Sequence, residues 1–228
     1  MTKDKTQADL DWAEGSAART RLAKSLDAAY AAGPGAAATQ RARAAARAAL
    51  AQEAGPAIHY DLLEDTPLGP LWVAAGPHGL VAVEYAGDER SEQSFRSYLA
   101  KLTTGSLVRG TEPVAAAMQQ VRLYLLGRTQ EFDLPVDLSH ITPFQRRVLE
   151  ATRRVPRGQV RTYAQIATQI GQPKAVRAVG QALRRNPIPI VVPCHRVVAS
   201  DGTLGGYAGN LRDQRKVDLL RLEGVYIA

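Results

Sequence analysis

The chain is poor in the residues that build disulfides and multi-thiolate metal sites. Of its 228 residues only one is a cysteine, Cys194, so an intramolecular disulfide is impossible and zinc sites built on several thiolates are excluded. The four histidines, His59, His78, His140 and His195, have no tight ligand spacing. We therefore expect neither a bound metal nor another cofactor.

Long apolar runs are also missing. No stretch approaches the roughly 18 apolar residues that a membrane-spanning helix needs, and residues 1–11 lack the apolar segment of a secretory signal. With the lone thiol, these absences predict a protein of the reducing cytoplasm without a membrane partner.

Acidic side chains are scarce in the last third of the chain. The net charge is +2 over residues 1–55, −5 over 56–140 and +10 over 141–228. Within residues 141–200 Glu150 is the only acid, against eleven lysines and arginines. On charge alone, a polyanionic partner and a solvated basic face explain this excess equally well.

Three segments that differ in composition and hydrophobic pattern indicate an α+β protein. Residues 1–55 hold 20 alanines and few large apolar side chains, which predicts two helices that pack on the rest or stay mobile. Residues 56–140 predict a small α/β domain, and residues 141–228 a mainly helical one. In the α/β domain we expect strands over 71–75 and 80–86 and helices over 91–101 and 113–126.

The helical segment contains the pattern of a helix-turn-helix. Thr142-Pro143 begins one helix, and helices over 162–170 and 173–185 follow, separated by Gly171-Gln172. Val176, Val179 and Leu183 are spaced for burial on the last of them. Its basic residues, Lys174, Arg177, Arg184 and Arg185, suit nucleic acid, although many helical hairpins bind nothing.

Cys194 lies in an apolar run, 188–198, next to His195 and Arg196. Basic neighbours lower the pKa of a thiol, and the thiolate is the nucleophilic form. In an extended segment adjacent side chains point to opposite faces, so either the chain bends here or a water links Cys194 to His195. Taken alone, a single cysteine is more often an inert core residue.

These residues resemble the methylated-DNA–protein-cysteine methyltransferases, also called O6-alkylguanine-DNA alkyltransferases. The motif Pro193-Cys194-His195-Arg196-Val197 carries the resemblance. Further matching motifs follow the family's order: Arg157-Gly158-Gln159-Val160 with Tyr163, Arg177-Ala178-Val179-Gly180, Asn186-Pro187, Gly206-Tyr207 and Glu223-Gly224. The resemblance implies a ribonuclease-H-like α/β domain followed by a winged-helix-like catalytic domain, with residues 1–55 as an addition.

The resemblance also implies a chemistry. Cys194 would take the alkyl group from O6-alkylguanine, and also from O4-alkylthymine, once and irreversibly. His195 would accept the thiol proton through a water, and Glu223 would orient and stabilise the imidazole. The protein would act as a monomer on double-stranded DNA.

Further residues match the family's DNA-handling positions. Arg177 would fill the gap left by a flipped base, Tyr163 would promote the flip and donate to the base, and the Val197 carbonyl would accept from the guanine amine. Asn186 would brace the turn beneath the cysteine. Tyr207 and Ser200 would line the pocket, and Pro189 and Gly209 would leave room in it for a benzyl group. The helix-turn-helix would enter the minor groove, where the DNA backbone would be approached by Gln145, Ala164 and Gln172.

Two other classes of protein share part of this pattern. Alkyltransferase-like lesion sensors bind alkylated DNA but lack the acceptor cysteine, whereas Cys194 is present here. A cysteine hydrolase needs a histidine brought against the thiol from elsewhere, and no other segment supplies an evident one. The zinc ligands found in the first domain of some family members are missing from this sequence.

Overall fold

The computed structural model describes residues 24, 39–46, 55–87, 91–110, 112–208, 210–211 and 213–226. Residue 24 and residues 39–46 are helical. The rest of the expected N-terminal helices lies outside the described residues, and so does Gly209. Residues 56–228 form one compact unit. In the parts that are described, no helix is long and apolar enough to cross a membrane.

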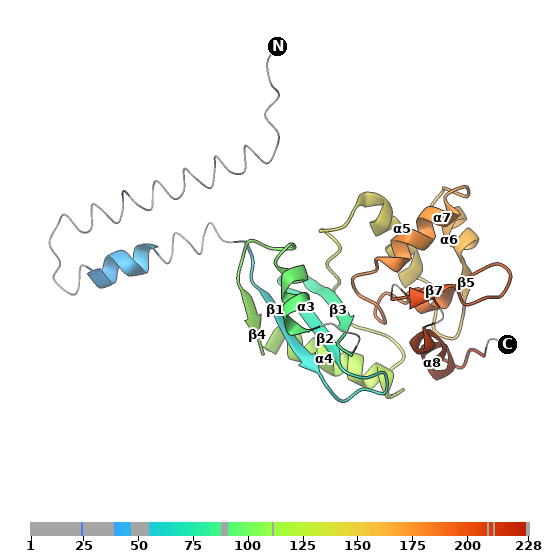
Figure 1. Ribbon diagram of the computed structural model, residues 1–228, viewed down its shortest axis with the longest axis horizontal. Coiled ribbons are helices and arrows are strands. Elements are labelled where there is room, and N and C mark those ends of the chain that lie inside the picture. The colour runs from blue at the N-terminus through green and yellow to red at the C-terminus, as the bar shows by residue number, and fades with distance from the viewer. Residues whose placement is uncertain are drawn as a thin grey trace, which may run out of the picture. The chain divides into compact units, whose positions relative to one another are not determined.

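A four-stranded sheet forms the first half of this unit (Figure 1). Its strands are β1 (Ile58–Leu63), β2 (Leu71–Gly76), β3 (Gly79–Tyr85) and β4 (Leu107–Arg109), in the order β3-β2-β1-β4. The first three strands are antiparallel, and β4 runs parallel to β1. The sequence predicted β2 and β3 but neither the inner strand β1 nor the edge strand β4.

Gly79 shows why the β2–β3 turn has its composition. Its φ is 122°, a conformation that favours glycine. A Cβ there would also lie 2.3 Å from the carbonyl oxygen of Pro135, which is far too close. The turn therefore needs glycine for two separate reasons.

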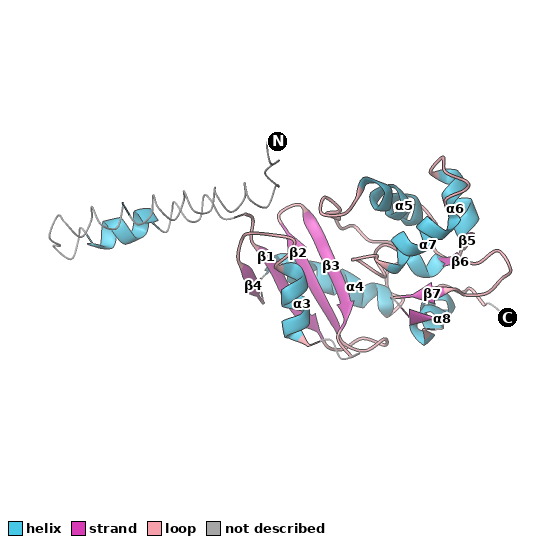
Figure 2. Cartoon of the chain, turned by 45° about the horizontal axis from the view of Figure 1, so that its top comes forward, coloured by secondary structure: helices cyan, strands magenta, loops and turns pink. Residues whose placement is uncertain are grey.

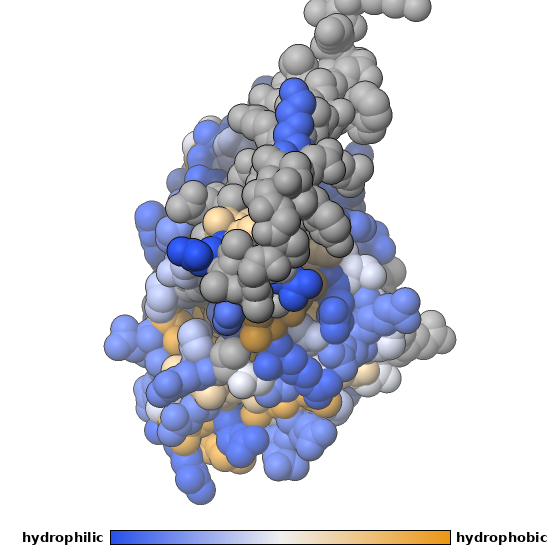
Figure 3. Space-filling model, turned by 90° about the vertical axis from the view of Figure 1, so that its left-hand side faces the viewer, coloured by the Kyte–Doolittle hydropathy of each residue, from blue (hydrophilic) through white to orange (hydrophobic). Residues whose placement is uncertain are grey.

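Two helices cover opposite faces of the sheet (Figure 2). On one face, α3 (Glu92–Leu99) packs Phe95 and Leu99 against Tyr60 and Trp72. On the other, α4 (Glu112–Leu125) contributes its buried face to the main core. We call β1–β4 with α3 and α4 the sheet domain. Its outer surface is mainly hydrophilic in the view of Figure 3.

The second half, the helical domain, contains α5 (Pro143–Arg153), α6 (Tyr163–Gln169), α7 (Val176–Arg184) and α8 (Gln214–Leu222). Four two-residue strands connect them: β5 (Arg161–Thr162), β6 (Val197–Val198), β7 (Gly206–Tyr207) and β8 (Asn210–Leu211). As predicted, Thr142 caps α5 by accepting from the backbone N–H of Gln145.

The start of α7 differs from the prediction. The helix begins at Val176 rather than Pro173, because residues 172–175 form a turn in which the N–H of Ala175 bonds the carbonyl of Gln172 at 2.9 Å. The expected burial of Val176 is therefore wrong, since it is 37% exposed. Val179 and Leu183 are buried as expected.

One continuous apolar core joins the two domains. It runs from Leu80 and Val121 of the sheet domain to Val148 and Leu219 of the helical domain. A backbone hydrogen bond from Val83 to the carbonyl of Pro187, at 2.9 Å, also crosses between them. The predicted α+β class is confirmed, and side chains of the sheet domain are within reach of the cysteine loop.

Candidate active site

Cys194 lies at a sharp bend in the backbone. Residues 188–192 form a turn closed by the N–H of Val192 on the carbonyl of Ile188, and Ile190 within it has a φ of 75°. The 3₁₀ helix η1 (Cys194–Arg196) follows and leads into β6, which pairs in parallel with β5. Of the two possibilities that the sequence left open, the chain does bend here.

The thiol is held by Asn186 and is almost fully buried. Cys194 is 6% exposed, and Nδ2 of Asn186 donates to its Sγ at 3.2 Å and to the carbonyl of Val192 at 2.9 Å. Burial raises the pKa of the Cys194 thiol, against the opposing effects of the Asn186 hydrogen bond and the Lys216 ammonium. The expected lowering of this pKa is thus wrong, because burial outweighs the positive neighbours.

The guanidinium of Arg196 is bound to Glu223 and not to the Cys194 sulfur. Both oxygens of Glu223 bind it, with Nε 2.8 Å from Oε2 and Nη2 3.1 Å from Oε1. Its Nη1 donates to the carbonyl of Val155 at 2.5 Å. The arginine therefore stabilises the carboxylate instead of the thiolate.

His195 and Glu223 form a buried pair. Nε2 of His195 lies 2.6 Å from Oε1 of Glu223, and both side chains have no exposed surface. Hydrogen bonds to His195 and Arg196 outweigh burial and hold the pKa of Glu223 at about 2. The carboxylate is thus ionised and can only accept, so Nε2 carries the imidazole proton.

The other ring nitrogen of His195 is suited to act as a base. Burial lowers the pKa of His195, so the imidazole is neutral near pH 7. With the proton on Nε2, the lone pair is on Nδ1. This atom is buried and has no hydrogen-bond partner among the described residues.

The end of α8 fixes Glu223 in place. Gly224 has a φ of 80°, its N–H bonds the carbonyl of Arg221, and the N–H of Val225 bonds the carbonyl of Leu220. This is the Schellman arrangement, in which glycine ends a helix in the left-handed conformation. The sequence pair Glu223-Gly224 therefore sets where the carboxylate stands.

Lys216 is a site residue that the sequence analysis missed. It is 1% exposed, and its Nζ donates to the carbonyls of Val197 at 2.6 Å and Leu204 at 2.5 Å. Burial lowers the pKa of Lys216 to about 8. Its spacing could have revealed it, since Lys216 is followed at helical intervals by the buried Leu219, Leu220 and Glu223.

Two tyrosines of the sheet domain were also missed. Tyr124, on α4, donates its hydroxyl to Oε1 of Glu223. The hydroxyl of Tyr85, on β3, lies 2.8 Å from that of Tyr207. No local sequence pattern predicts either contact, because Tyr124 and Glu223 are 99 residues apart and Tyr85 and Tyr207 are 122 residues apart.

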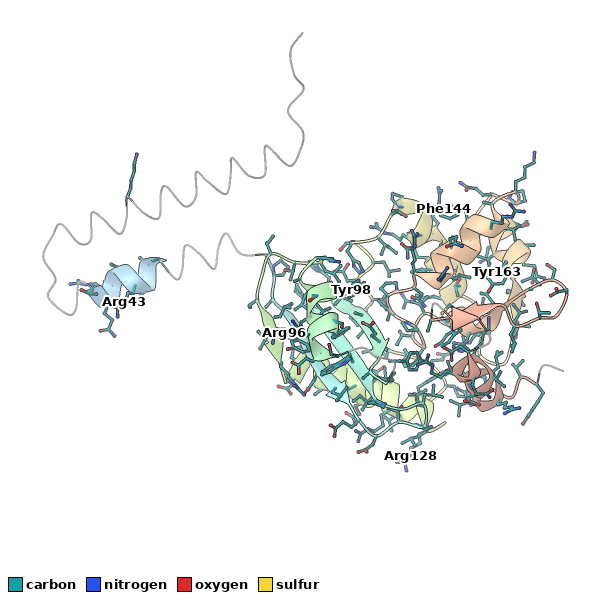
Figure 4. The ribbon with its side chains drawn as sticks, viewed as in Figure 1. Arg43, Arg96, Tyr98, Arg128, Phe144 and Tyr163 are labelled. Carbon is teal, nitrogen blue, oxygen red and sulfur yellow. The ribbon has the colours of Figure 1, made fainter. Side chains whose placement is uncertain are left out.

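Of the predicted pocket residues, Tyr163 and Tyr207 lie near the cysteine loop. Tyr163 is the first residue of α6 (Figure 4). It is half-buried, and a Cβ on Gly205 would meet its hydroxyl at 2.6 Å. Tyr207 is buried, and its ring lies nearly perpendicular to the His195 ring at a centroid distance of 6.3 Å. Pro189 is buried at the rim of a cleft of about 740 Å³ that Asn186 and Ala208 also line.

The predicted DNA contacts are less uniform. Arg177 and Gln172 are exposed on or beside α7, Ala164 is half-buried on α6, and Ser200 is exposed beyond β6. The amide of Gln145 donates to the carbonyl of Arg185 at 2.8 Å, so it is used within the protein. The exposed cations of the helix-turn-helix are Lys174, Arg177, Arg184 and Arg185.

Comparison with known proteins gives two adjoining family matches. Residues 58–138 match the ribonuclease-like domain of 6-O-methylguanine DNA methyltransferase, and residues 143–225 match its DNA binding domain. The methylated-DNA–protein-cysteine methyltransferase of Salmonella typhimurium is 44% identical over 168 residues, covering 72% of this chain and 96% of its own. The constitutive enzyme of Bacillus subtilis is 39% identical over 173 residues, covering 74% and 97%.

Solved structures agree with these matches. The O6-methylguanine methyltransferase of Mycobacterium tuberculosis is 38% identical, with a TM-score of 0.61, over 73% of this chain and 92% of its own. A structure of the same organism's protein in complex with DNA has 37% identity and a TM-score of 0.59, over 72% and 92%. The predicted two-domain architecture is thereby confirmed.

Proposed function

Because this chain belongs to the 6-O-methylguanine DNA methyltransferase family, we propose that it repairs DNA by moving the alkyl group of O6-alkylguanine to its own Cys194. The observation that carries the proposal is a buried Cys194 thiol held by Asn186 and followed directly in the chain by the buried His195–Glu223 pair. A single nucleophile beside a neutral histidine and an ionised carboxylate suits one proton transfer and one substitution.

The Cys194 thiolate forms during the reaction and is not the resting form of the side chain. Since burial raises the pKa of Cys194, little thiolate exists at pH 7 until a base removes the proton. Nδ1 of neutral His195 takes that proton through a water, and Glu223 stabilises the resulting imidazolium. Lys216 and the amide of Asn186 stabilise the negative sulfur.

The transfer is a substitution at the alkyl carbon. Sγ of Cys194 forms the new C–S bond while the bond from that carbon to guanine O6 breaks, and its electron pair stays on the base. The hydroxyl of Tyr163 donates a hydrogen bond to the base, and the carbonyl of Val197 holds the guanine amine. The proton that His195 took from the thiol returns through water to the base, so that neutral guanine and neutral His195 result. Unmodified guanine leaves, and the thioether on Cys194 has no hydrolytic exit. Each molecule therefore acts once.

The target base reaches the thiol by leaving the duplex, which costs a few kcal/mol. The exposed α7 presents Arg177 to fill the vacated stack, while Ala164 and Gln172 lie at the DNA backbone. The helix-turn-helix enters the minor groove, which suits a protein that reads shape rather than sequence. O4-alkylthymine is a second substrate of the same pocket. Pro189, Tyr207 and Ser200 border it.

We assign residues 56–140 to the ribonuclease-like domain, residues 141–228 to the catalytic domain and residues 1–55 to an extension. The protein works as a monomer on nucleoid DNA in the cytoplasm. No metal or cofactor takes part, since Cys194, His195 and Glu223 supply the nucleophile, the base and its counter-charge.

Intact-mass spectrometry tests the proposal. After incubation with a duplex carrying O6-methylguanine, the mass should rise by one methyl group in place of a hydrogen, on the Cys194 peptide. A lesion sensor would bind without any mass change. A hydrolase would process many substrates per molecule, so either result would contradict the proposal.

A further inference from the structure

Glu223 receives a donor that comes from the other domain. Tyr124 lies near the end of α4, is fully buried, and donates its hydroxyl to Oε1 of Glu223. The same oxygen accepts Nε2 of His195 at 2.6 Å and Nη2 of Arg196 at 3.1 Å. Three donors therefore share the carboxylate oxygen that faces the imidazole.

The orientation of the Tyr124 hydroxyl is fixed by its neighbours. Nη2 of Arg196 lies 3.0 Å from the phenol oxygen and can only donate, so the hydroxyl accepts from Arg196 and donates to Glu223. Burial raises the pKa of Tyr124 to about 12, so the proton stays on the phenol. The ring is held by Phe132, at a centroid distance of 4.5 Å, and by the guanidinium of Arg157, 5.1 Å away.

We propose that Tyr124 is a positioning residue through which the ribonuclease-like domain sets how strongly His195 acts as a base. The hydroxyl shares the negative charge on Oε1, which would otherwise act fully on the imidazole. Without the hydroxyl, Glu223 stabilises the imidazolium more, and His195 is protonated at a higher pH. The inference rests on the proposed function, in which neutral His195 takes the thiol proton.

The charged groups that act on His195 are Glu223 and the cations of Arg196 and Lys216, which lower its pKa. The Tyr207 ring lies 6.3 Å from the imidazole between centroids, and the Cys194 thiol belongs to the preceding residue. Tyr124→Phe also removes the bond from Arg196 to the hydroxyl, but Arg196 keeps its bonds to both oxygens of Glu223 and to the carbonyl of Val155. A change in the pH dependence of transfer on altering Tyr124 therefore reports on the bonds of its hydroxyl to Glu223 and Arg196.

The test is the pH profile of transfer from the free base O6-benzylguanine to the full-length protein, between pH 5 and 8. This substrate avoids any effect on DNA binding. For Tyr124→Phe we expect the acid limb to move up by roughly 0.5–1 pH unit, with a rate loss of about threefold to tenfold near pH 6. The loss should shrink toward pH 8, where His195 is neutral in both proteins.

A matched variant separates this effect from a general loss of stability. Tyr60→Phe removes another tyrosine hydroxyl that donates to a glutamate, Glu92 at 2.7 Å, within the same domain but far from the site. This variant should not move the acid limb, whatever it does to stability.

Site-specific 3-fluorotyrosine at position 124 keeps the hydroxyl but makes it a stronger donor, so the acid limb should move down. This variant also serves if Tyr124→Phe does not fold. An unmoved limb in both variants, or a loss of rate that is equal at every pH, would overturn the inference. If the wild-type protein itself fails to take up the benzyl group, the proposed function is what fails.

Discussion

Lys216 is a single residue whose charge affects the nucleophile. No carboxylate pairs with this buried ammonium among the described residues, and it lowers the pKa of the Cys194 thiol against the effect of burial. The arrangement is costly for a lysine, because burial disfavours its charged form. Such a cost is typical of residues retained for chemistry.

We expect Lys216→Met to raise the pKa of the thiol and to slow transfer below pH 8 by about tenfold, the size of a shift of one unit. Lys216→Arg keeps the charge and should lose much less. Iodoacetamide labelling of Cys194 against pH measures the thiol directly. A rate loss in Lys216→Met that is the same at every pH would instead mean that the lysine only holds the loops of Val197 and Leu204.

Arg177 is exposed on α7 and makes no hydrogen bond or ion pair with the described residues. Its planar guanidinium can stack and hydrogen-bond inside a duplex, which lysine cannot do equally well. Arg177→Ala should therefore slow repair of duplex DNA by about tenfold to a hundredfold, an extrusion cost of a few kcal/mol. Transfer from free O6-benzylguanine should barely change.

Measurements at two salt concentrations identify the alternative role. If Arg177 were only a phosphate contact, its loss would weaken all DNA binding and reduce the salt slope by about one. Lys174→Gln, on the turn before α7, provides the matched loss of an exposed cation. Equal losses on duplex and free base would show that Arg177 supports the fold.

At the scale of elements, α6 begins with a complete capping box. The hydroxyl of Thr162 accepts from the N–H of Gln165 at 3.1 Å, and the side chain of Gln165 accepts from the N–H of Thr162 at 2.8 Å. Thr162 also belongs to β5, which pairs with β6 just after the cysteine loop. The cap thus fixes the position of Tyr163 at the start of α6.

Thr162→Ala should lower the free energy of unfolding by about 1 kcal/mol, the usual contribution of an N-cap. Urea unfolding measures the loss. Thr168→Ala on the same helix is the control, since its exposed hydroxyl bonds only the carbonyl of Ala164 one turn back. That bond adds little stability, so a similar loss in both variants would contradict a specific role of the cap.

The sequence predicted the elements that carry strong local signals. Thr142-Pro143 begins α5, the strands expected over 71–75 and 80–86 match β2 and β3, and Val179 and Leu183 are buried. The start of α7 was misplaced because proline at 173 suits a first helical turn but here belongs to a separate turn. Local preference cannot distinguish these two uses of proline.

The candidate site was predictable only in part. The motif around Cys194 and the pair Glu223-Gly224 were visible, and the structure brings His195 and Glu223 together. Tyr124 was not visible as a site residue, because its role depends on tertiary contact between distant segments. The net pKa of the thiol was misjudged for a similar reason, since burial cannot be read from charged neighbours.

At the scale of the whole molecule, the Glu223 network links both domains and makes stability depend on pH. The pKa of Glu223 is about 2 in the folded protein, against about 4.3 in an unfolded chain. A depressed pKa gives stability that is fully present above pH 4.3 and is lost as the pH falls toward 2. The loss should amount to about 3 kcal/mol.

Urea unfolding of wild type and Glu223→Gln at pH 7, 4.5 and 3 measures this contribution. The variant should be less stable at pH 7 and should lose less stability on acidification. Asp201→Asn, an exposed carboxylate bonded only to the nearby Thr203, is the control. Parallel pH dependence in wild type and Glu223→Gln would show that other carboxylates control acid unfolding.

The N-terminal extension can be separated from the repair function by deletion. The residues of the proposed site, from Tyr124 to Glu223, lie in the unit formed by residues 56–228, and the family matches begin at residue 58. Deleting residues 1–54 should therefore leave transfer from free O6-benzylguanine unchanged. Transfer from a short duplex should change by less than about twofold, since the proposed DNA contacts lie on α6 and α7.

The alternative is that the extension contacts DNA through Arg41, Arg43 and Arg47, because three cations near DNA would strengthen binding in a salt-dependent way. A loss confined to DNA, larger at low salt and reproduced by changing these arginines to glutamine, would make the extension part of the DNA interface. A loss on both substrates would mean that the extension supports the fold of the catalytic unit.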